Sequence, residues 1–211
     1  MDDARLTIAW QDARFVVVDK PAGVAVHRGW AAGGDDDVPL LQRVRDQLDA
    51  YVHLINRLDR GASGAVLFAL DAEAARAASD AFAAGTVDKR YLAITRGHPP
   101  AELVIDYAIP TEVGGPRGDA VTALRCLDTF GRYALVEARP RTGRLHQIRR
   151  HCKHAGHPLI GDATHGKGAL NRALAAHFGV SRLWLHAWRL QLPDGRRLQA
   201  DPGPEWDQFI A

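Results

Sequence analysis

A short segment around Asp59 combines the residue types that carboxylate catalysis requires. Asp59 stands between Arg57 and Arg60, and residues 61–64 then lead into an apolar run. A nearby positive charge favours the ionised form of a carboxyl group, which is the form that acts as a nucleophile. The segment therefore predicts a reactive carboxylate. The alternative is an exposed loop acid that only forms a local ion pair, and the segment alone is compatible with both.

A second segment has the spacing of an amphipathic helix with an arginine at the edge of its apolar stripe. On a helix over residues 145–155, positions 145, 148, 152 and 155 form the stripe, and Arg149 falls about 40° from Leu145. An unpaired charge that faces the core is strongly destabilising, so a carboxylate should meet Arg149, and Asp59 is a candidate. The alternative is that the Arg149 side chain extends along the surface to solvent.

The other face of the same helix is polar and basic. It carries His146, Arg150, Lys153 and His154, and Arg144 comes just before it. Arginine side chains bind phosphate oxygens in pairs, so this face is a candidate for contact with a phosphate backbone. Residues 139–172 contain eight Lys or Arg and a single acid, although the net charge of the whole chain is only +2. The alternative is a solvated charged face without a ligand.

A third segment places Tyr91 at the start of an apolar run, directly after Lys89 and Arg90. A tyrosine beside two cations can stack on a nucleic-acid base. The alternative is a half-buried tyrosine that only packs, and the residue types in this segment fit both interpretations.

Neither a metal nor a cofactor is predicted. The chain has ten histidines, but those at positions 151, 154 and 157 have no accompanying cluster of carboxylates. It contains no glycine-rich nucleotide-binding loop and no nucleophile elbow of the serine hydrolases.

The elements that must position these segments are short strands and a few helices. Strands are predicted at residues 15–18, 64–70, 91–95, 121–127, 133–138 and 183–192, and helices at 39–50, 71–84, 145–155, 170–178 and 205–210. Residues 31–37 and 111–119 are predicted loops. Several strands follow each other after short turns, which favours antiparallel pairing. We therefore expect one α+β domain over residues 1–211, with a mixed, largely antiparallel sheet flanked by helices.

The composition indicates a cytoplasmic protein. The two cysteines, Cys126 and Cys152, are too few for a disulfide framework, so we expect reduced thiols. The N-terminus is acidic where a signal peptide would be basic, and the apolar runs are too short to span a bilayer. No predicted helix has an additional apolar stripe that a partner chain would have to cover, so a monomer is expected.

Several of these segments resemble one known family. Residues 56–64 are similar to the His-Arg-Leu-Asp-Arg-x-Thr-Ser-Gly signature of the RluA family of pseudouridine synthases. Residues 141–162 resemble its Thr-Gly-Arg-x-His-Gln-Ile-Arg segment with the trailing Gly-His-Pro-Leu-Ile-Gly-Asp, and residues 19–23 its Asn-Lys-Pro-x-Gly. Residues 27–30, 161–166, 171–172 and 177–179 are similar to its TruC-like branch, which modifies a uridine in the T stem of tRNA.

The resemblance implies a pseudouridine synthase fold and a role for each matched residue. Asp59 would attack the ribose or the base, Tyr91 would stack on the flipped base and assist removal of the C5 proton, and Arg149 would pair with Asp59. Further RNA contacts would come from Arg57, which enters the base stack, and from Arg60, Arg144, His146, Arg150 and Lys153. No cofactor, metal or appended RNA-binding domain of the S4 type is implied.

Two positions depart from the family pattern: Asn56 stands where histidine is usual and Ala62 where threonine is common. An asparagine still donates and accepts hydrogen bonds, so we expect the loop to keep its shape. Three other functions stay open at this point. They are a synthase that acts on ribosomal RNA, a non-catalytic RNA-binding module, and a hydrolase or nuclease that uses Asp59 together with histidines.

Overall fold

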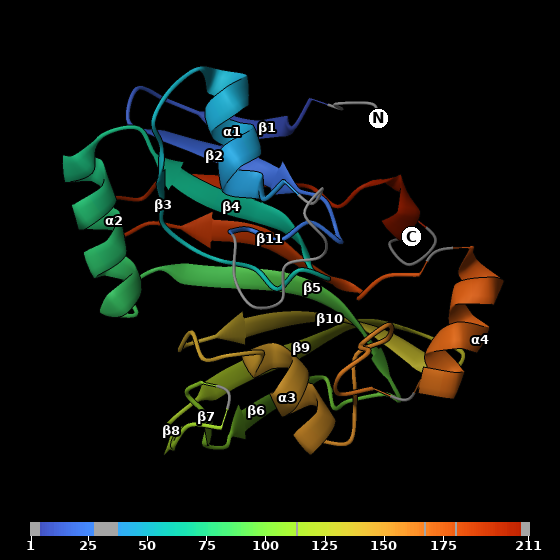
Figure 1. Cartoon of the computed structure of the whole chain (residues 1–211). Coiled ribbons are helices and arrows are strands. Elements are labelled where there is room, and N and C mark those ends of the chain that lie inside the picture. Colours follow the sequence, from blue (N-terminus) through green and yellow to red (C-terminus); the bar gives the residue numbers. More distant parts are fainter. Residues whose placement is uncertain (1–4, 28–37, 113, 167, 180, 208–211) are drawn as a thin grey trace. The chain divides into compact units, whose positions relative to one another are not determined.

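The computed structural model of the chain describes residues 5–27, 38–112, 114–166, 168–179 and 181–207 (Figure 1). The predicted loop at 31–37 and the matched residues 28–30 lie outside these ranges. Contacts within the chain group it into two compact units, of which the first comprises residues 1–87 and 187–202 and the second residues 88–186 and 203–211. The single catalytic domain therefore stays a prediction.

The first unit is built on a sheet of short strands. Their order is β1 (Thr7–Gln11), β2 (Phe15–Lys20), β4 (Ser63–Ala69) and β11 (Leu185–Gln191, of which residues 187–191 belong to this unit), with β3 (His53–Leu54) beside β4 and β12 (Arg197–Gln199) beside β11. The pairs β1–β2, β2–β4, β3–β4 and β11–β12 are antiparallel. The register places Lys20, at the end of β2, opposite Gly64 at the start of β4.

Both faces of this sheet are buried, because alternate residues of its strands point into two different apolar clusters. In β2, Phe15 and Val17 belong to a cluster that also contains residues of helix α2 (Ala72–Ala83). Val16 and Val18 belong to the other cluster, which contains residues of helix α1 (Leu40–Leu48). The residues of β4 alternate in the same way, and every one of them is buried.

The helices of the first unit begin and end close to the predicted residues. The carboxylate of Asp71 caps α2 by accepting a hydrogen bond from the backbone N–H of Ala74 at 2.7 Å. Gly85, with φ +70°, follows the last turn of α2. Helix α1 ends at Asp49, which adopts the left-handed conformation. Asp71 at the start of α2 and Gly85 after its last turn are residue types that commonly begin and end helices.

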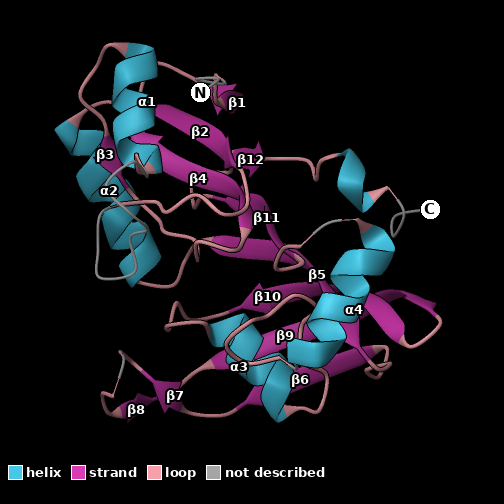
Figure 2. Ribbon diagram, turned by 45° about the vertical axis from the view of Figure 1, so that its right-hand side comes forward, coloured by secondary structure: helices cyan, strands magenta, loops and turns pink. Residues whose placement is uncertain are grey.

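The second unit is built on four neighbouring strands of a sheet (Figure 2). The strand order is β5 (Asp88–Arg96), β10 (Tyr133–Pro140), β9 (Val121–Phe130) and β6 (Glu102–Asp106), and all neighbours are antiparallel. Helix α3 (Gln147–His154) packs on β9 and β10. The remaining elements are the small hairpin β7 (Ile109–Pro110) and β8 (Arg117–Gly118), helix α4 (Gly168–Phe178) and the 3-10 turn η1 (Pro204–Trp206).

The predicted fold class is confirmed, and the six predicted strands and four of the five predicted helices are present. The prediction missed strands that are short or lie at an edge, such as β1 and β6, because each has only a brief apolar run between polar end residues. The predicted loop at 111–119 contains β8, and the helix expected at 205–210 is a 3-10 turn over residues 204–206 within the part described. None of the helices described is long and apolar enough to cross a membrane.

Candidate active site

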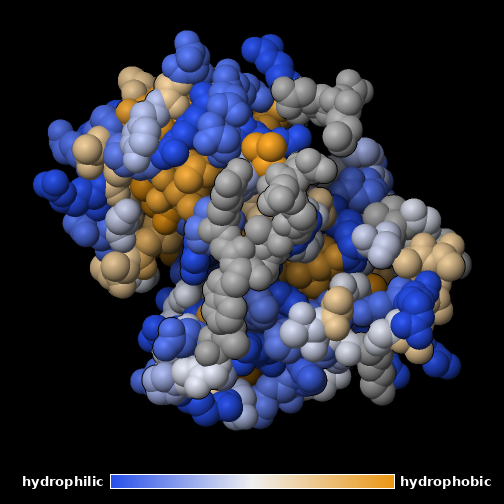
Figure 3. All heavy atoms as spheres, viewed as in Figure 1, coloured by the Kyte–Doolittle hydropathy of each residue, from blue (hydrophilic) through white to orange (hydrophobic). Residues whose placement is uncertain are grey.

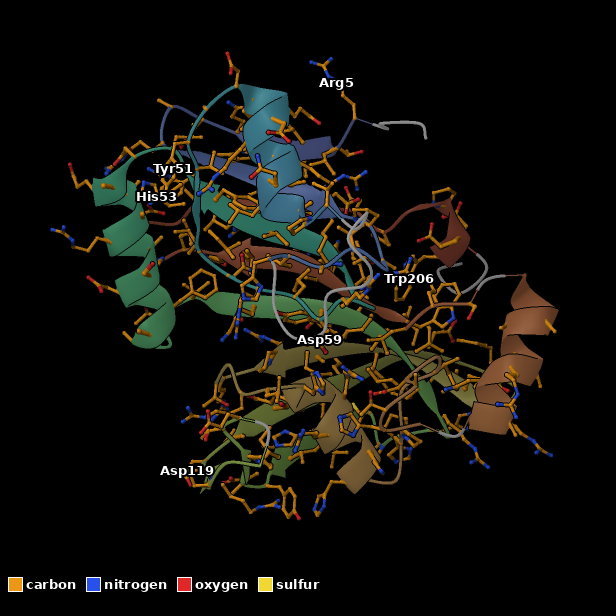
Figure 4. The ribbon with its side chains drawn as sticks, viewed as in Figure 1. Arg5, Tyr51, His53, Asp59, Asp119 and Trp206 are labelled. Carbon is orange, nitrogen blue, oxygen red and sulfur yellow. The ribbon has the colours of Figure 1, made fainter. Side chains whose placement is uncertain are left out.

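Asp59 lies in the loop between β3 and β4 of the first unit (Figure 4). Its side chain is half-buried, and its carbonyl oxygen accepts a hydrogen bond from the N–H of Ala62 at 3.0 Å. The buried side chain of Asn56 holds the start of this loop against β4. Its oxygen accepts from the N–H of Leu67 at 2.7 Å, and its nitrogen donates to the carbonyl oxygen of Ala65 at 3.3 Å. Asparagine in place of the usual histidine therefore keeps the loop attached to the strand, as expected.

Lys20 holds the other side of the Asp59 loop. Its side chain is completely buried (0% exposed), and its ammonium group donates to the carbonyl oxygens of Pro21 and Val24 at 2.8 Å and of Arg60 at 3.2 Å. The Arg60 carbonyl also accepts from the N–H of Gly23 at 2.8 Å. The main chain next to Asp59 is thereby tied to the end of β2. The sequence contained the signal for this contact in residues 19–23, but no role could be assigned to Lys20 from it.

Gly64 is required where the loop enters β4. It has φ +107°, and a Cβ atom at this position would lie 2.3 Å from the carbonyl oxygen of Ala187. Any other residue would therefore push β4 away from β11. This close approach explains a glycine directly after Ser63, at the end of the matched segment.

The two arginines beside Asp59 are exposed. The Nη1 atom of Arg57 lies 3.4 Å from Nε2 of His27, and the side chain of Arg60 projects from the same turn that Lys20 binds through its carbonyl. Both positions are accessible to a large polyanion, as their predicted RNA contacts require.

Helix α3 begins two residues later than predicted, at Gln147 rather than Leu145. His146 adopts the left-handed conformation with φ 53°, so it precedes the helix instead of lying on its polar face. The physical reason is the buried side chain of Gln147. Its oxygen accepts from the hydroxyl of Thr142 at 2.6 Å and from the N–H of Arg144 at 3.0 Å, which holds residues 142–146 in a tight turn.

The nitrogen of the Gln147 side chain completes this anchor. It donates to the carbonyl oxygen of Val121 at 2.9 Å and to the hydroxyl oxygen of Thr122 at 3.0 Å, both in β9. The turn that carries Arg144 is therefore fastened to the sheet by one amide side chain. In the sequence, Gln147 is only one residue of a matched segment, and this function was not predicted.

His151 continues the network from β9 and was also missed. It is completely buried, with Nδ1 at 2.9 Å from the hydroxyl of Thr122 and Nε2 at 2.9 Å from the carbonyl oxygen of Tyr107. Since a carbonyl only accepts, Nε2 carries the proton, and in the neutral ring Nδ1 accepts from the Thr122 hydroxyl. Burial lowers the pKa of His151, which keeps the ring neutral.

Arg149 is buried, with 7% of its surface exposed, so the alternative in which it extends to solvent is wrong. Its Nε donates to Oδ2 of Asp162 at 2.9 Å and its Nη2 to Oδ1 at 2.8 Å. The expectation that a carboxylate must meet Arg149 is confirmed, and within the second unit that carboxylate is Asp162. In the sequence, Asp162 stands out only as the one acid of a basic region and as the last residue of a matched segment, and no role was predicted for it. The pairing of Arg149 with Asp59 stays a prediction.

Asp162 is an ionised carboxylate in a protein interior. Burial raises its pKa, but the hydrogen bonds from Arg149 and from the backbone N–H of His165 outweigh that effect and hold the pKa below its usual value. The Oδ1 atom also accepts from the N–H groups of Thr164 at 3.0 Å and His165 at 2.8 Å. The Arg149–Asp162 pair therefore meets the condition under which a buried ion pair is tolerated, namely good geometry with the remaining lone pairs satisfied.

The residues predicted to contact phosphates lie around α3, where the surface is mainly hydrophilic (Figure 3). Arg144 and Lys153 are exposed, and Nε of Arg144 donates to the carbonyl oxygen of Asp119 at 3.3 Å. Arg150 is half-buried, and its Nε has no hydrogen-bond acceptor among the residues that the structure describes. The ring of His146 lies beside that of His165, with Nδ1 and Nε2 3.2 Å apart.

Tyr91 lies near the start of β5, opposite Ala138 of β10, and is half-buried. Lys89 is two residues earlier and therefore on the same face of the strand. Its buried ammonium group donates to the carbonyl oxygen of Thr142 at 3.2 Å, and burial lowers its pKa. Lys89 thus connects the strand that carries Tyr91 to the turn before α3.

No group of three or more potential ligands that could hold a metal ion occurs within the described ranges. Cys126 and Cys152 are both free thiols, and burial raises the pKa of Cys152 to about 12. Cys152 is therefore a packing residue on the core side of α3 and not a reactive nucleophile.

Two solved structures with a similar fold are human RNA pseudouridylate synthase domain proteins. The structure of human RNA pseudouridylate synthase domain containing 1 matches with a TM-score of 0.79 and 27% sequence identity, covering 97% of this chain and 86% of that chain. Human RNA pseudouridylate synthase domain containing 4 matches with a TM-score of 0.78 and 27% identity, covering 96% of this chain and 92% of that chain. The fold is that of the pseudouridylate synthases.

The family model for RNA pseudouridylate synthase matches residues 14–154, and the chain belongs to this family of isomerases that act on RNA. Two similar curated proteins are the tRNA pseudouridine synthases C of Salmonella typhimurium and Pectobacterium carotovorum. The first is 42% identical over 89% of this chain and 80% of its own length, and the second is 41% identical over 89% of this chain. This chain spans only 55% of the length of the Pectobacterium protein.

Proposed function

We propose that this chain converts one uridine in the T stem of tRNA into pseudouridine, with Asp59 as the essential carboxylate. The family supplies the reaction class, and relatives from Salmonella typhimurium and Vibrio cholerae, which are 42% and 38% identical, are named tRNA pseudouridine synthase C. The T stem comes from the resemblance of residues 27–30 and 161–179 to the TruC-like branch. Ribosomal RNA is the alternative substrate that the test must separate from tRNA.

The observation that carries this proposal is the anchoring of the main chain on both sides of Asp59. Asn56 fastens one side to β4, and Lys20 fastens the other through the Arg60 carbonyl. A carboxylate that must approach a sugar or a base in one orientation loses rate when its position fluctuates. An exposed acid in a local ion pair has no need of two buried anchors, so the anchors favour the catalytic interpretation.

The reaction is an isomerisation in which atoms and electrons balance without a co-reactant. The Asp59 carboxylate attacks the ribose or the base, and the N-glycosidic bond between N1 and C1′ breaks. The freed uracil turns in place, C5 bonds to C1′, and the carboxylate is released. The proton on C5 leaves, and N1 takes up a proton. No cofactor or metal enters any of these steps.

Three other residues serve the reaction in this proposal. Arg149 pairs with the Asp59 carboxylate through donors that Asp162 does not use, Tyr91 stacks on the extruded uracil and assists removal of the C5 proton, and Arg57 takes the place of the extruded base. Extrusion is needed because bases in an RNA helix are stacked and inaccessible, and it costs a few kcal/mol. An arginine that fills the vacated position recovers part of that cost by stacking.

RNA binding is assigned to the remaining basic side chains, namely Arg60 in the first unit and Arg144, His146, Arg150 and Lys153 in the second. Exposure of Arg60, Arg144 and Lys153 supports the assignment. We also propose a cytoplasmic monomer, and the free thiols of Cys126 and Cys152 fit a reducing compartment.

The test uses purified protein and unmodified tRNA transcripts that contain C5-tritiated uridine. We expect tritium release at one T-stem position, located by carbodiimide-adduct primer extension. Asp59→Asn should lower the release rate at least about 1,000-fold, because the carboxylate forms the reacting bond. Asp49→Asn is the matched control, since Asp49 is an exposed acid at the end of α1 in the same unit and should leave the rate unchanged.

Release only from ribosomal RNA transcripts would replace tRNA as the substrate and leave the reaction in place. Full activity of Asp59→Asn would contradict the role of Asp59. Strand cleavage or release of free uracil would indicate a hydrolase instead.

A further inference from the structure

We infer that Asp162 is a positioning residue, which orients the guanidinium group of Arg149 and balances its charge for the chemistry at Asp59. The inference rests on the proposed function, and it concerns a residue to which neither the sequence segments nor the matched relatives attach a role here. It is argued from the contacts of the second unit alone.

The geometry of the pair determines the orientation of Arg149. The guanidinium group is planar and carries five N–H donors in a rigid fork. Asp162 accepts one bond from Nε at 2.9 Å and one from Nη2 at 2.8 Å, so two parallel bonds hold one edge of the plane. Rotation about the terminal bonds of Arg149 is thereby blocked. The three remaining N–H donors then have a direction that Asp162 determines.

Asp162 can act in this way because its own position is strongly restrained. Its side chain is 1% exposed and accepts from the N–H groups of Thr164 and His165. Its carbonyl oxygen accepts from the side chain of Asn171 at 2.9 Å, and the same side chain accepts from the N–H of Gly161 at 3.1 Å. The turn that contains Asp162 is thus tied to α4 on both sides of the residue.

A close backbone contact adds a further restraint to this turn. Gly161 has φ +75°, and a Cβ atom there would overlap with the carbonyl oxygen of Arg182 at 1.7 Å. The chain therefore passes at van der Waals distance from residues 182–183, which restrains the backbone directly before Asp162.

The pair also sets the local charge. Arg149 and Asp162 are both buried and of opposite sign, so together they add almost no net charge to the interior. Without the Asp162 carboxylate, the full positive charge of Arg149 would act on any carboxylate nearby. A stronger positive field favours the ionised form of such a group and makes it a weaker nucleophile. In the proposed pairing of Arg149 with Asp59, Asp162 would balance the charge of the arginine while it holds the guanidinium group in place.

The experiment separates positioning from folding by comparing three variants of the full chain. Asp162→Asn removes the charge, and Asp162→Glu keeps the charge but displaces the carboxylate by one methylene group. Glu137→Gln is the matched control, because Glu137 is also a buried carboxylate of the second unit and pairs with Arg90 and Arg125 in the sheet. Thermal unfolding is recorded for each variant, together with its Kd for tRNA.

The readout is the single-turnover rate of tritium release at saturating protein, which does not depend on RNA affinity. We expect Asp162→Asn and Asp162→Glu to lower this rate about 30-fold to 100-fold, with Kd changed less than about twofold and Glu137→Gln close to wild type. The pH at which the rate is half-maximal on the acid side should move down in Asp162→Asn, because the positive charge is no longer balanced. In Asp162→Glu it should stay at the wild-type value.

Non-additivity provides the second criterion. If Asp162 acts through Arg149, then Asp162→Asn should cost little further rate in an Arg149→Lys background. The positioning role would be rejected if Asp162→Asn lowered the rate by the same factor in wild-type and in Arg149→Lys protein. It would also be rejected if Glu137→Gln lowered the rate as much as the Asp162 variants do. A wild-type single-turnover rate in either Asp162 variant, while Asp59→Asn is inactive, would reject it and leave the proposed function intact. Absence of pseudouridine formation by wild-type protein would instead reject the proposed function.

Discussion

Each of the two units contains a buried cation next to a predicted catalytic segment, but the two cations bind different partners. In the first unit, Lys20 donates to three backbone carbonyl oxygens beside the Asp59 loop. In the second unit, Arg149 donates two parallel bonds to the side chain of Asp162. The ammonium group thus determines the path of the main chain, whereas the carboxylate determines the orientation of the guanidinium group.

The difference follows from the chemistry of the two side chains. Lysine carries a compact charge with three donors that can converge on carbonyls from separate stretches of chain. Arginine carries a planar fork whose orientation is itself the useful property. A change at Lys20 should therefore act mainly on the fold of the loop, while a change at Asp162 should act on the rate. Two further residues test the contrast: Gln147, which holds the turn before α3, and His151, which binds Thr122 of the neighbouring strand β9.

The largest effect on stability is expected for Lys20→Met. The variant keeps the length of the side chain but removes the buried ammonium donor from three carbonyl groups, of which that of Arg60 keeps a second donor, the N–H of Gly23. We expect the free energy of unfolding to fall by about 3–5 kcal/mol, measured by urea denaturation. Lys153→Met removes an exposed lysine and should stay within about 0.5 kcal/mol of wild type. A loss below about 1 kcal/mol for Lys20→Met would contradict an anchoring role.

A smaller effect is expected for Gln147→Leu in the second unit. The variant removes four hydrogen bonds of the Gln147 side chain, two to the 142–144 turn and two to β9. We therefore expect a loss of about 2–3 kcal/mol in the free energy of unfolding. The turn also carries Arg144, so the Kd for tRNA should rise several-fold. Gln42→Ala, at an exposed position of α1, serves as the control for both measurements. Unchanged tRNA affinity in a destabilised Gln147→Leu protein would separate the turn from RNA binding.

The smallest effect is the pH dependence contributed by His151. Burial lowers its pKa in the folded protein, so the unfolded chain binds more protons below the usual value of 6.5. The free energy of unfolding should therefore decrease as the pH falls from about 7 to 5. His165, whose pKa is also lowered, contributes in the same direction, and Asp162 does so at more acidic pH. Urea midpoints at pH 5, 6, 7 and 8 measure the slope, which should be flatter in His151→Asn. An identical slope in the variant would exclude His151 as a contributor.

The sequence predicted well where a local pattern carries the information. The strands at 15–18 and 64–70, the helix at 71–84 and the apolar stripe of α3 depend on neighbours within a few residues, and the structure contains all of them. It predicted poorly where a side chain reaches across the fold. The late start of α3 depends on Gln147 bonding to β9, which is more than 20 residues away in the chain.

The sequence by itself determined the family, through segments that occur in the right order, and the need for a carboxylate at Arg149, through its place on the helical wheel. Only the tertiary structure decided that Asp162 is a carboxylate that pairs with Arg149, and that Lys20 and Asn56 hold the Asp59 loop. The physical reason is that burying a charge or an amide requires partners of the right chemistry, but does not specify which ones. The packing of strands and turns that lie far apart in the sequence determines which partners a buried group finds.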